Sequence, residues 1–184
     1  MQFLKLLFSF APWLSFLIIA RGSLERLELG LGVALALSVT MGLLRLHRGI
    51  ILWVGLAFFS LALVLVMAFH NMWTVQHMGV LANGALAAGA WVGIVRKSPF
   101  TLDYAKDHTP REAWTSAPFL RANMIISTAW AMAFTASAAL AWMKMERLYV
   151  SDLAYEGCSY AILIATALFT QLYPAWLKRR ATTG

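Results

Sequence analysis

The sequence contains few charged residues and a single cysteine. Asp, Glu, Lys and Arg make up 12% of its 184 residues, whereas a soluble globular chain has about 25%. Residues 50–95 include none of the four. Because Cys158 is the only cysteine, an internal disulfide and a cysteine-rich metal site are both excluded.

Apolar residues are correspondingly abundant. They form 61% of the chain, and the mean hydropathy is +0.71. A soluble domain of this size could not hide so much apolar surface, because most of the surface of a small domain faces water. The composition therefore excludes a soluble enzyme, a disordered tail and a collagen-like fibre. It indicates an integral membrane protein.

The chain is also basic, with a net charge of +7, yet its basic residues lie between apolar runs. The positive-inside rule and the anionic lipids of the inner leaflet produce this arrangement. We therefore expect the lipid bilayer as a partner and no nucleic acid.

Six apolar segments can be recognised, and a helix needs about 20 residues to cross a hydrocarbon core of about 30 Å. The first segment contains Lys5 and Pro12, which favours a shallow or re-entrant helix. Because Ala20-Arg21-Gly22 is a poor signal-peptidase site and further apolar spans follow, we expect this segment to be retained and not cleaved as a signal peptide. We expect one integral membrane domain over residues 1–184, an all-α polytopic transmembrane bundle of five to six helices. The segments are residues 3–20, 29–44, 50–69, 78–95, 124–143 and 158–177.

The uncharged stretch 50–95 is about twice as long as one membrane-spanning helix. It has to turn, and His70-Asn71-Met72-Trp73 is the expected turn. Asparagine tolerates the left-handed backbone, and the polar groups of this stretch favour water. The sequence thus predicts a helical hairpin with an uncharged tip.

Lysine and arginine are unevenly divided between the two sides of this bundle. With six crossings, the positive-inside rule places both termini and the loops at 45–49 and 96–123 in the cytoplasm. If the first segment does not cross, the N-terminus moves to the other side and the remaining assignments hold. The cytoplasmic side holds Lys5, Arg45, Arg48, Arg96, Lys97, Lys106, Arg111, Arg121, Lys178, Arg179 and Arg180, and the other side holds Arg21, Arg26, Lys144 and Arg147.

Residues 96–123 form the only sizeable polar region, which we expect to be a cytoplasmic interfacial loop with two short helices. Ser98-Pro99 indicates the start of the first. Thr109, Pro110 and Glu112 fit a capping box at the start of the second. Aromatic and basic residues would anchor this loop on the membrane surface. A docking surface or a lid over a substrate is the alternative.

Small residues recur every four positions in the fourth and fifth segments, and such spacing lets helices approach closely in lipid. It predicts that these two helices pack on each other, or that they form a homo-oligomer contact. We expect Asn83 to hydrogen-bond between helices and Glu28 to lie in the first turn of its helix. The small residues are Ala85, Gly89, Gly93, Ala129, Ala133, Ser137 and Ala141. The tryptophans near segment ends, expected in an interfacial belt, are Trp53, Trp73, Trp91, Trp142 and Trp176.

Several short motifs occur in an order that resembles one bacterial family. They are Phe8-Ser9-Phe10-Ala11-Pro12, Phe69-His70-Asn71, Lys97 with Pro99, Trp114, Asn123 and Trp130-Ala131. Over about residues 3–175 the chain distantly resembles the intracellular septation protein A family of inner-membrane proteins. The resemblance implies a role in cell-envelope maintenance or septation through envelope-synthesis or division proteins. The candidate functional or partner-contact residues are His70, Asn71, Lys97, Pro99, Trp114, Asn123 and Trp130.

The sequence contains none of the familiar catalytic or phosphate-binding motifs, and we expect no cofactor or metal. We therefore expect a non-enzymatic, multi-pass protein of the bacterial inner membrane with a cytoplasmic C-terminus. A small transporter or channel would need a polar path built from Ser60, Asn83, Asn123, Ser127, Thr128 and Thr135. A membrane enzyme acting on lipid or a redox cofactor would need one cavity shared by His70, His77, Asp103, Asp107, His108 and Glu112.

Overall fold

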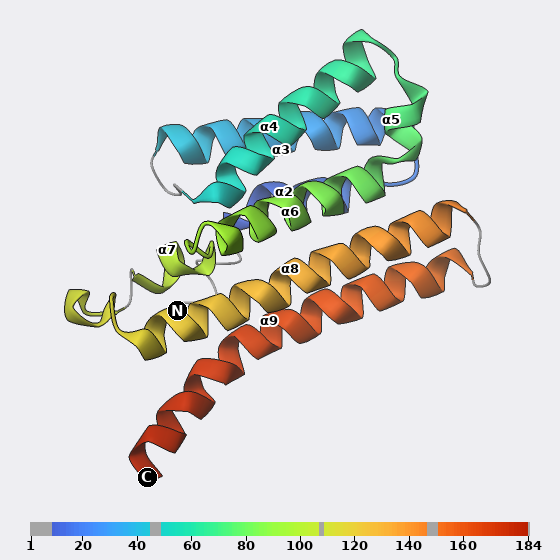
Figure 1. The fold of residues 1–184 in the computed structure, drawn as a ribbon. Helices are drawn as coiled ribbons and strands as arrows, with labels where there is room; N and C mark the ends of the chain where they lie inside the picture. Colours follow the sequence, from blue (N-terminus) through green and yellow to red (C-terminus); the bar gives the residue numbers. More distant parts are fainter. Residues whose placement is uncertain (1–8, 45–48, 107–108, 147–150, 184) are drawn as a thin grey trace.

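The structure is a computed structural model that describes residues 9–44, 49–106, 109–146 and 151–183. The sequence-based proposals for Lys5, Arg45, Arg48, Asp107 and His108 therefore fall outside the described residues, as does the one for Arg147. The described chain folds into helices joined by short connections (Figure 1). The prediction of an all-α helical bundle is confirmed.

Among the described residues, five helices are long and apolar enough to cross a membrane, so the protein is a multi-pass membrane protein. Two match the predicted segments closely: α6 (Met78–Val95), and α4 (Ile50–Leu63) with its π-helical continuation η1 (Val64–Ala68). The other three begin five to seven residues earlier than predicted. They are α3 (Leu24–Leu43), α8 (Ala117–Met145) and α9 (Asp152–Thr183), of which Asp152–Leu177 is the candidate span.

The early start of α3 has a local cause. The Ser23 side chain accepts a hydrogen bond from the amide of Arg26 at 3.3 Å, which caps the helix at Leu24. Glu25 then occupies the first turn, so the prediction that Glu28 lies there is wrong. Pro118 similarly stands at the start of α8, where its missing N–H costs nothing.

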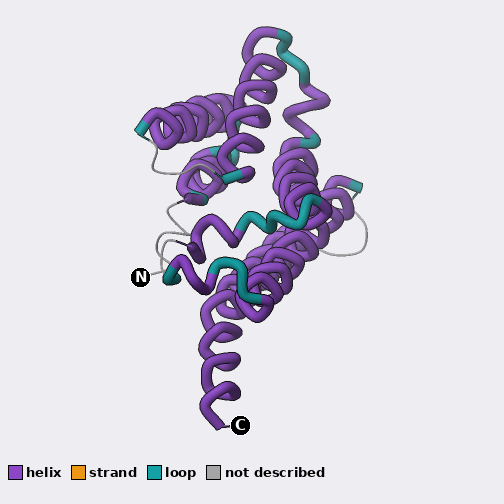
Figure 2. Tube along the Cα trace, turned by 60° about the vertical axis from the view of Figure 1, so that its left-hand side comes forward, coloured by secondary structure: helices purple, strands orange, loops and turns teal. Residues whose placement is uncertain are grey.

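The bundle has two ends that differ in their connections (Figure 1). At the α7 end, α3 finishes, α4 begins, α6 finishes, α8 begins and α9 finishes. At the α5 end, η1 passes through the short helix α5 (Met72–Gln76) into α6, and α8 gives way to α9. The last turns of α9 extend beyond the start of α8 (Figures 1 and 2).

In the described part of the first apolar segment, residues 9–20, the helix is α2 (Ala11–Ile19). Nine helical residues rise about 14 Å, too little to cross a bilayer, and α2 is not among the candidate spans. The ring of Phe10, just before α2, meets that of Phe100, just before α7 (Thr101–Lys106), at 6.2 Å in a T-shaped arrangement. The polar loop therefore enters the bundle and meets α2, where a surface-lying loop had been predicted.

Aromatic rings fill the middle of the bundle. Trp13 lies 4.7 Å from Phe59, and Phe10 stacks on Trp130 at 5.6 Å. Each such pair contributes about 0.5–1.5 kcal/mol beyond its buried area. Because lipid is as apolar as these side chains, close packing is what distinguishes the folded bundle from separated helices.

The packing of α6 against α8 confirms the pairing predicted from the small residues, although not every residue serves it. Ala133 and Ser137 are buried, and a Cβ added at Gly79 would lie 3.5 Å from that of Ala141. By contrast, a Cβ at Gly89 would come within 2.7 Å of Val54 on α4, and one at Gly93 within 3.0 Å of the Ser98 carbonyl. Gly89 therefore allows the close approach of α4, and Gly93 that of the loop after α6, instead of α8.

The predicted hairpin turn is present at the α5 end, with a different residue in the left-handed conformation. His70 has φ of 47°, while Asn71 has φ of −76° and accepts a hydrogen bond from the Thr74 amide at 3.0 Å. Asn71 thus caps α5 and does not supply the turn itself. The segment-end tryptophans are exposed, as an interfacial belt requires, namely Trp53, Trp73, Trp91, Trp142 and Trp176.

Candidate functional site

A buried polar cluster fixes the loop at the α7 end. The Thr101 hydroxyl donates to the backbone carbonyl of Asn123 at 3.0 Å and lies 2.9 Å from the Ser127 hydroxyl. The Thr101 amide also donates to that hydroxyl, at 3.4 Å. Since buried polar groups are costly without partners, these bonds hold α7 against α8.

The next part of the loop is organised around Trp114. Its indole N–H donates to the Thr109 carbonyl at 2.8 Å, and the charged groups of Lys106 and Arg111 lie 5.6 and 5.8 Å from its ring centroid. The predicted capping box is wrong, because the Thr109 hydroxyl donates back to the Ala105 carbonyl at 2.8 Å. The helix that follows is only the 3-10 turn η2 (Arg111–Ala113).

Tyr104 ties the loop to the N-terminal part of the chain. Its phenol hydrogen-bonds the side chain of Ser9, and burial raises its pKa well above the ordinary value of 10.0. Burial disfavours the charged phenolate, so Tyr104 stays neutral. The loop is therefore held by α8 on one side and by the start of α2 on the other.

The exposed part of the α7 end is basic. Arg96, Lys97 and Arg111 are exposed, and Lys97 adopts a left-handed φ of 55° as α6 ends. Its amide donates to the Ile94 carbonyl at 2.9 Å, which sets this turn. The α7 end thus combines a fixed loop with a set of solvent-facing cations.

The structure divides the seven sequence-predicted residues between the two ends. His70 and Asn71 lie at the α5 end, where His70 is exposed. The other five lie on the α7 loop or on α8. Lys97 is exposed and Trp114 is half-buried, whereas the side chains of Pro99, Asn123 and Trp130 are buried. In this arrangement those three support the loop and the bundle.

A cleft of about 660 Å³ opens among the helix ends at the α5 end. Its walls come from the end of α2, the starts of α3, α6 and α9, and the end of α8. This volume lies within the range of small-molecule sites, about 300–1,000 Å³. Apolar lining residues include Phe16, Leu27, Met78, Leu140 and Leu163.

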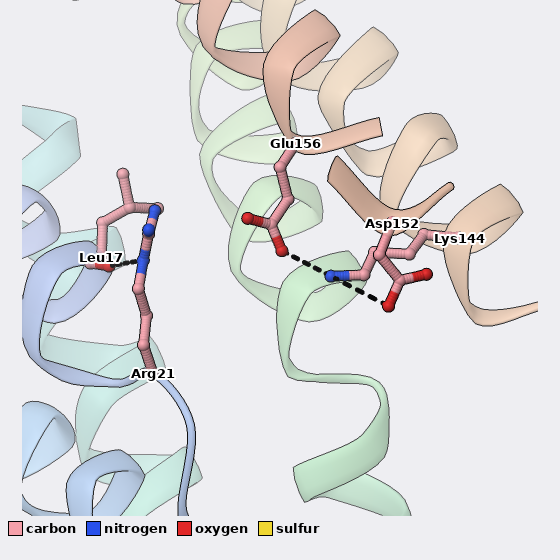
Figure 3. A network of polar contacts seen from close by, with 5 residues as sticks. All are labelled: Leu17, Arg21, Lys144, Asp152 and Glu156. Atoms are coloured by element: carbon pink, nitrogen blue, oxygen red, sulfur yellow. Dashed lines mark hydrogen bonds and ion pairs between the residues drawn. The ribbon is translucent and has the colours of Figure 1, made fainter. Parts of the chain in front are cut away.

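Charged side chains stand at this cleft (Figure 3). Lys144 at the end of α8 reaches toward two carboxylates of α9, with Nζ at 2.5 Å from Glu156 and 4.0 Å from Asp152. Arg21 lies across from them, where its Nε donates to the Leu17 carbonyl at 3.0 Å and its guanidinium sits 5.3 Å from the Tyr160 ring centroid. Surface ion pairs of this kind add little stability, about 0–1 kcal/mol. Their main effect is therefore to hold charged groups in place at the cleft.

Sequence reasoning missed this cleft. In the sequence, Arg21 and Lys144 were noted only as charges on the less basic side, and Ser137 only as a small packing residue. Tyr155 and Glu156 were assigned nothing. One sequence feature could have pointed to the cleft. Lys144, Asp152 and Glu156 flank a short connection between two predicted long helices, on the side of the membrane with few charges.

Two residues predicted to act between helices or in chemistry bond locally. The Asn83 amide donates to the Gly79 carbonyl of its own helix at 2.9 Å, so the expected interhelical bond is wrong. The Nδ1–H of His77 donates to the Trp73 carbonyl at 2.7 Å, and the imidazole stacks on the Trp73 ring. Within the described ranges, no group of three or more His, Cys, Asp or Glu side chains could hold a metal ion.

Comparison of the chain with protein-family models, with curated proteins and with solved structures found no match.

Proposed function

We propose that this protein supports cell-envelope maintenance or septation in the bacterial inner membrane by holding a partner protein at its α7 end. It acts there by binding and catalyses no reaction. The α7 end faces the cytoplasm, where the positive-inside rule puts the richer set of Lys and Arg. The order of short motifs shared with the septation protein A family supports the same role.

The observation that carries this proposal is the fixed basic loop. Thr101 anchors α7 to α8 through Asn123 and Ser127, while Arg96, Lys97 and Arg111 remain exposed. A binding surface held in one shape loses little conformational freedom on association, which favours affinity. Cations on its rim attract an acidic partner and speed the encounter.

The other two functions considered from the sequence find less support in the arrangement of the described residues. The hydroxyls of Thr128 and Thr135 donate to carbonyls of their own helix at 2.9 and 2.8 Å. The centre between the helices is filled by aromatic rings such as those of Trp13 and Phe59. His70 and His77 belong to the α5 end, whereas Asp103 and Glu112 belong to the opposite end.

A crosslinking pull-down from native membranes tests the proposal, using two triple variants with equal loss of charge. The first replaces three exposed loop cations, and the second replaces three cations at the end of α9 on the same predicted side of the membrane. The loop variant is Arg96→Gln with Lys97→Gln and Arg111→Gln, and the control is Lys178→Gln with Arg179→Gln and Arg180→Gln.

The expected result is an envelope-synthesis or division protein that crosslinks to the wild type and to the control but at least tenfold less to the loop variant. An equal loss in both variants would mean that general attraction to anionic lipid carries the signal. Recovery of only the protein itself and lipid would contradict the proposal.

A further inference from the structure

Two residues that line the cleft at the α5 end carry buried hydroxyl groups that have no hydrogen-bond partner among the described residues. They are the Ser137 Oγ on α8 and the Tyr155 phenol on α9. The two residues are only 1% and 5% exposed. A buried hydroxyl without a partner costs about 1–3 kcal/mol, so a pair of them in one cleft calls for an explanation.

Four threonines on these two helices use their hydroxyls differently from Ser137. Thr128, Thr135, Thr166 and Thr170 each donate to the carbonyl four residues earlier in their own helix, at 2.8 to 2.9 Å. Ser137 lies in the middle of α8, where such a carbonyl is within reach, yet it makes no such bond. Its hydroxyl is therefore an unused donor on a residue that lines the cleft.

The cleft also provides a cation and apolar walls. Arg21 uses its Nε for the Leu17 carbonyl and forms no ion pair with a described residue. Its remaining guanidinium N–H groups can donate to an anion, and guanidinium matches phosphate oxygens well. Arg21 is exposed, whereas Ser137 and Tyr155 are buried. The cationic group therefore lies near the surface of the apolar-lined cleft, and the two hydroxyl-bearing residues lie deeper.

We propose that this cleft binds a glycerophospholipid. The phosphodiester would be bound by Arg21 at the opening, and its acyl ester carbonyls would accept hydrogen bonds from Ser137 and Tyr155. Ester carbonyls are acceptors without a donor, which suits two hydroxyls that need to donate. The acyl chains would lie against apolar residues such as Phe16, Met78 and Leu163.

Carboxylates at the cleft do not oppose an anionic headgroup. Glu156 and Asp152 both face Lys144, at 2.5 and 4.0 Å, so its one positive charge offsets one of their two negative charges. With Arg21 counted, the charged residues that line the cleft are two cations and one carboxylate. Asp152 does not line the cleft, but with it the four charges sum to zero. A headgroup phosphate would therefore meet Arg21, which forms no ion pair with a described residue.

The test measures binding of dioctanoyl phosphatidylglycerol to the delipidated full-length protein by native mass spectrometry. Its diether analogue has the same headgroup and chain length but lacks both ester carbonyls. Glycerophosphoglycerol, which has no acyl chains, distinguishes a lipid site from a site for a free phosphodiester.

We expect the wild type to bind the diester about 5- to 100-fold more tightly than the diether, since each hydroxyl contributes about a twofold to tenfold gain. Glycerophosphoglycerol should not compete at equal concentration. Similar binding of diester and diether would overturn the assignment of the hydroxyls, and full competition by glycerophosphoglycerol would overturn the lipid itself. These comparisons use the wild type, so they do not depend on the folding of a variant.

Matched variants then locate the site. Ser137→Ala with Tyr155→Phe should abolish the preference for the diester, whereas Ser60→Ala with Tyr173→Phe, which lie outside the cleft, should keep it. Arg21→Gln should weaken binding of both lipids about tenfold, and Arg26→Gln, an exposed neighbour that does not line the cleft, should not. Equal losses in a cleft variant and its control would overturn the proposal.

Discussion

The contact between α2 and α3 offers a prediction whose size follows from the structure. A Cβ added at Gly30 would lie 2.9 Å from the Ala20 Cβ, 3.1 Å from its amide nitrogen and 3.2 Å from its Cα. Favourable contacts between carbon atoms lie at about 3.5–4.0 Å. Two of the three atoms belong to the backbone, so no side-chain rotation relieves the overlap. Gly30→Ala therefore forces α2 and α3 apart.

Gly32 provides the matched control, because it lies on the same helix and a Cβ there would meet nothing within 4 Å. Both substitutions gain the same helix propensity, about 1 kcal/mol. Overpacking costs about 1–3 kcal/mol and applies only at Gly30. We therefore expect Gly30→Ala to be less stable than Gly32→Ala by about 1–3 kcal/mol in free energy of unfolding.

Reversible unfolding in mixed micelles, with the denaturing detergent as the titrant, measures this difference. Comparing two alanine variants on one helix cancels the effect of micelle composition on helix propensity. Equal unfolding free energies for the two variants would refute the close approach of Ala20 to Gly30. A less stable Gly32→Ala would refute the orientation of α3 as well.

Two further predictions concern the loop at the α7 end. Thr101→Val removes the hydroxyl that bridges Asn123 and Ser127, so it should lower the free energy of unfolding by about 0.5–1.5 kcal/mol and speed tryptic cleavage at Arg96, Lys97 and Arg111. The control is Thr128→Val, which removes a hydroxyl that bonds its own helix, and this variant should be cleaved at the wild-type rate. Equal cleavage rates in the two variants would contradict the anchoring role of Thr101. Because burial raises the pKa of Tyr104, the stability from its neutral phenol is present below the unfolded pKa and is lost as pH rises through the folded pKa. In a spectrophotometric titration of the tyrosines, Tyr104→Phe should therefore reduce the absorbance change above about pH 10 and leave the change at lower pH as in the wild type. An unchanged titration above that pH would show that the Tyr104 phenol is not buried.

The sequence was sufficient to predict the class of fold and the positions of most spans. The apolar run after the predicted turn gives α6 to the residue, and small residues every four positions correctly pair α6 with α8. Both signals are local, because a helix in lipid satisfies its backbone within one segment. The starts of α3 and α8 were missed because Ser23 and Pro118 begin those helices within polar sequence.

Features that depend on contacts between distant segments were not predictable in this way. The insertion of the α7 loop depends on Thr101 meeting Ser127 and on Phe100 meeting Phe10. No pattern within residues 96–123 encodes either contact. The cleft at the α5 end is a sharper case, because its polar groups come from separate helix ends. Ser137 looked like one more small packing residue, and only burial without a partner distinguishes it.

The most direct test of the proposed function is photo-crosslinking in living cells from a photoreactive amino acid placed at Arg96. The same amino acid at Arg26, at the opposite end of the bundle, serves as the control. The account predicts a single dominant adduct with an envelope-synthesis or division protein from position 96 and none from position 26. Adducts with that partner from position 26 alone, or adducts with only lipid and the protein itself from both positions, would contradict it.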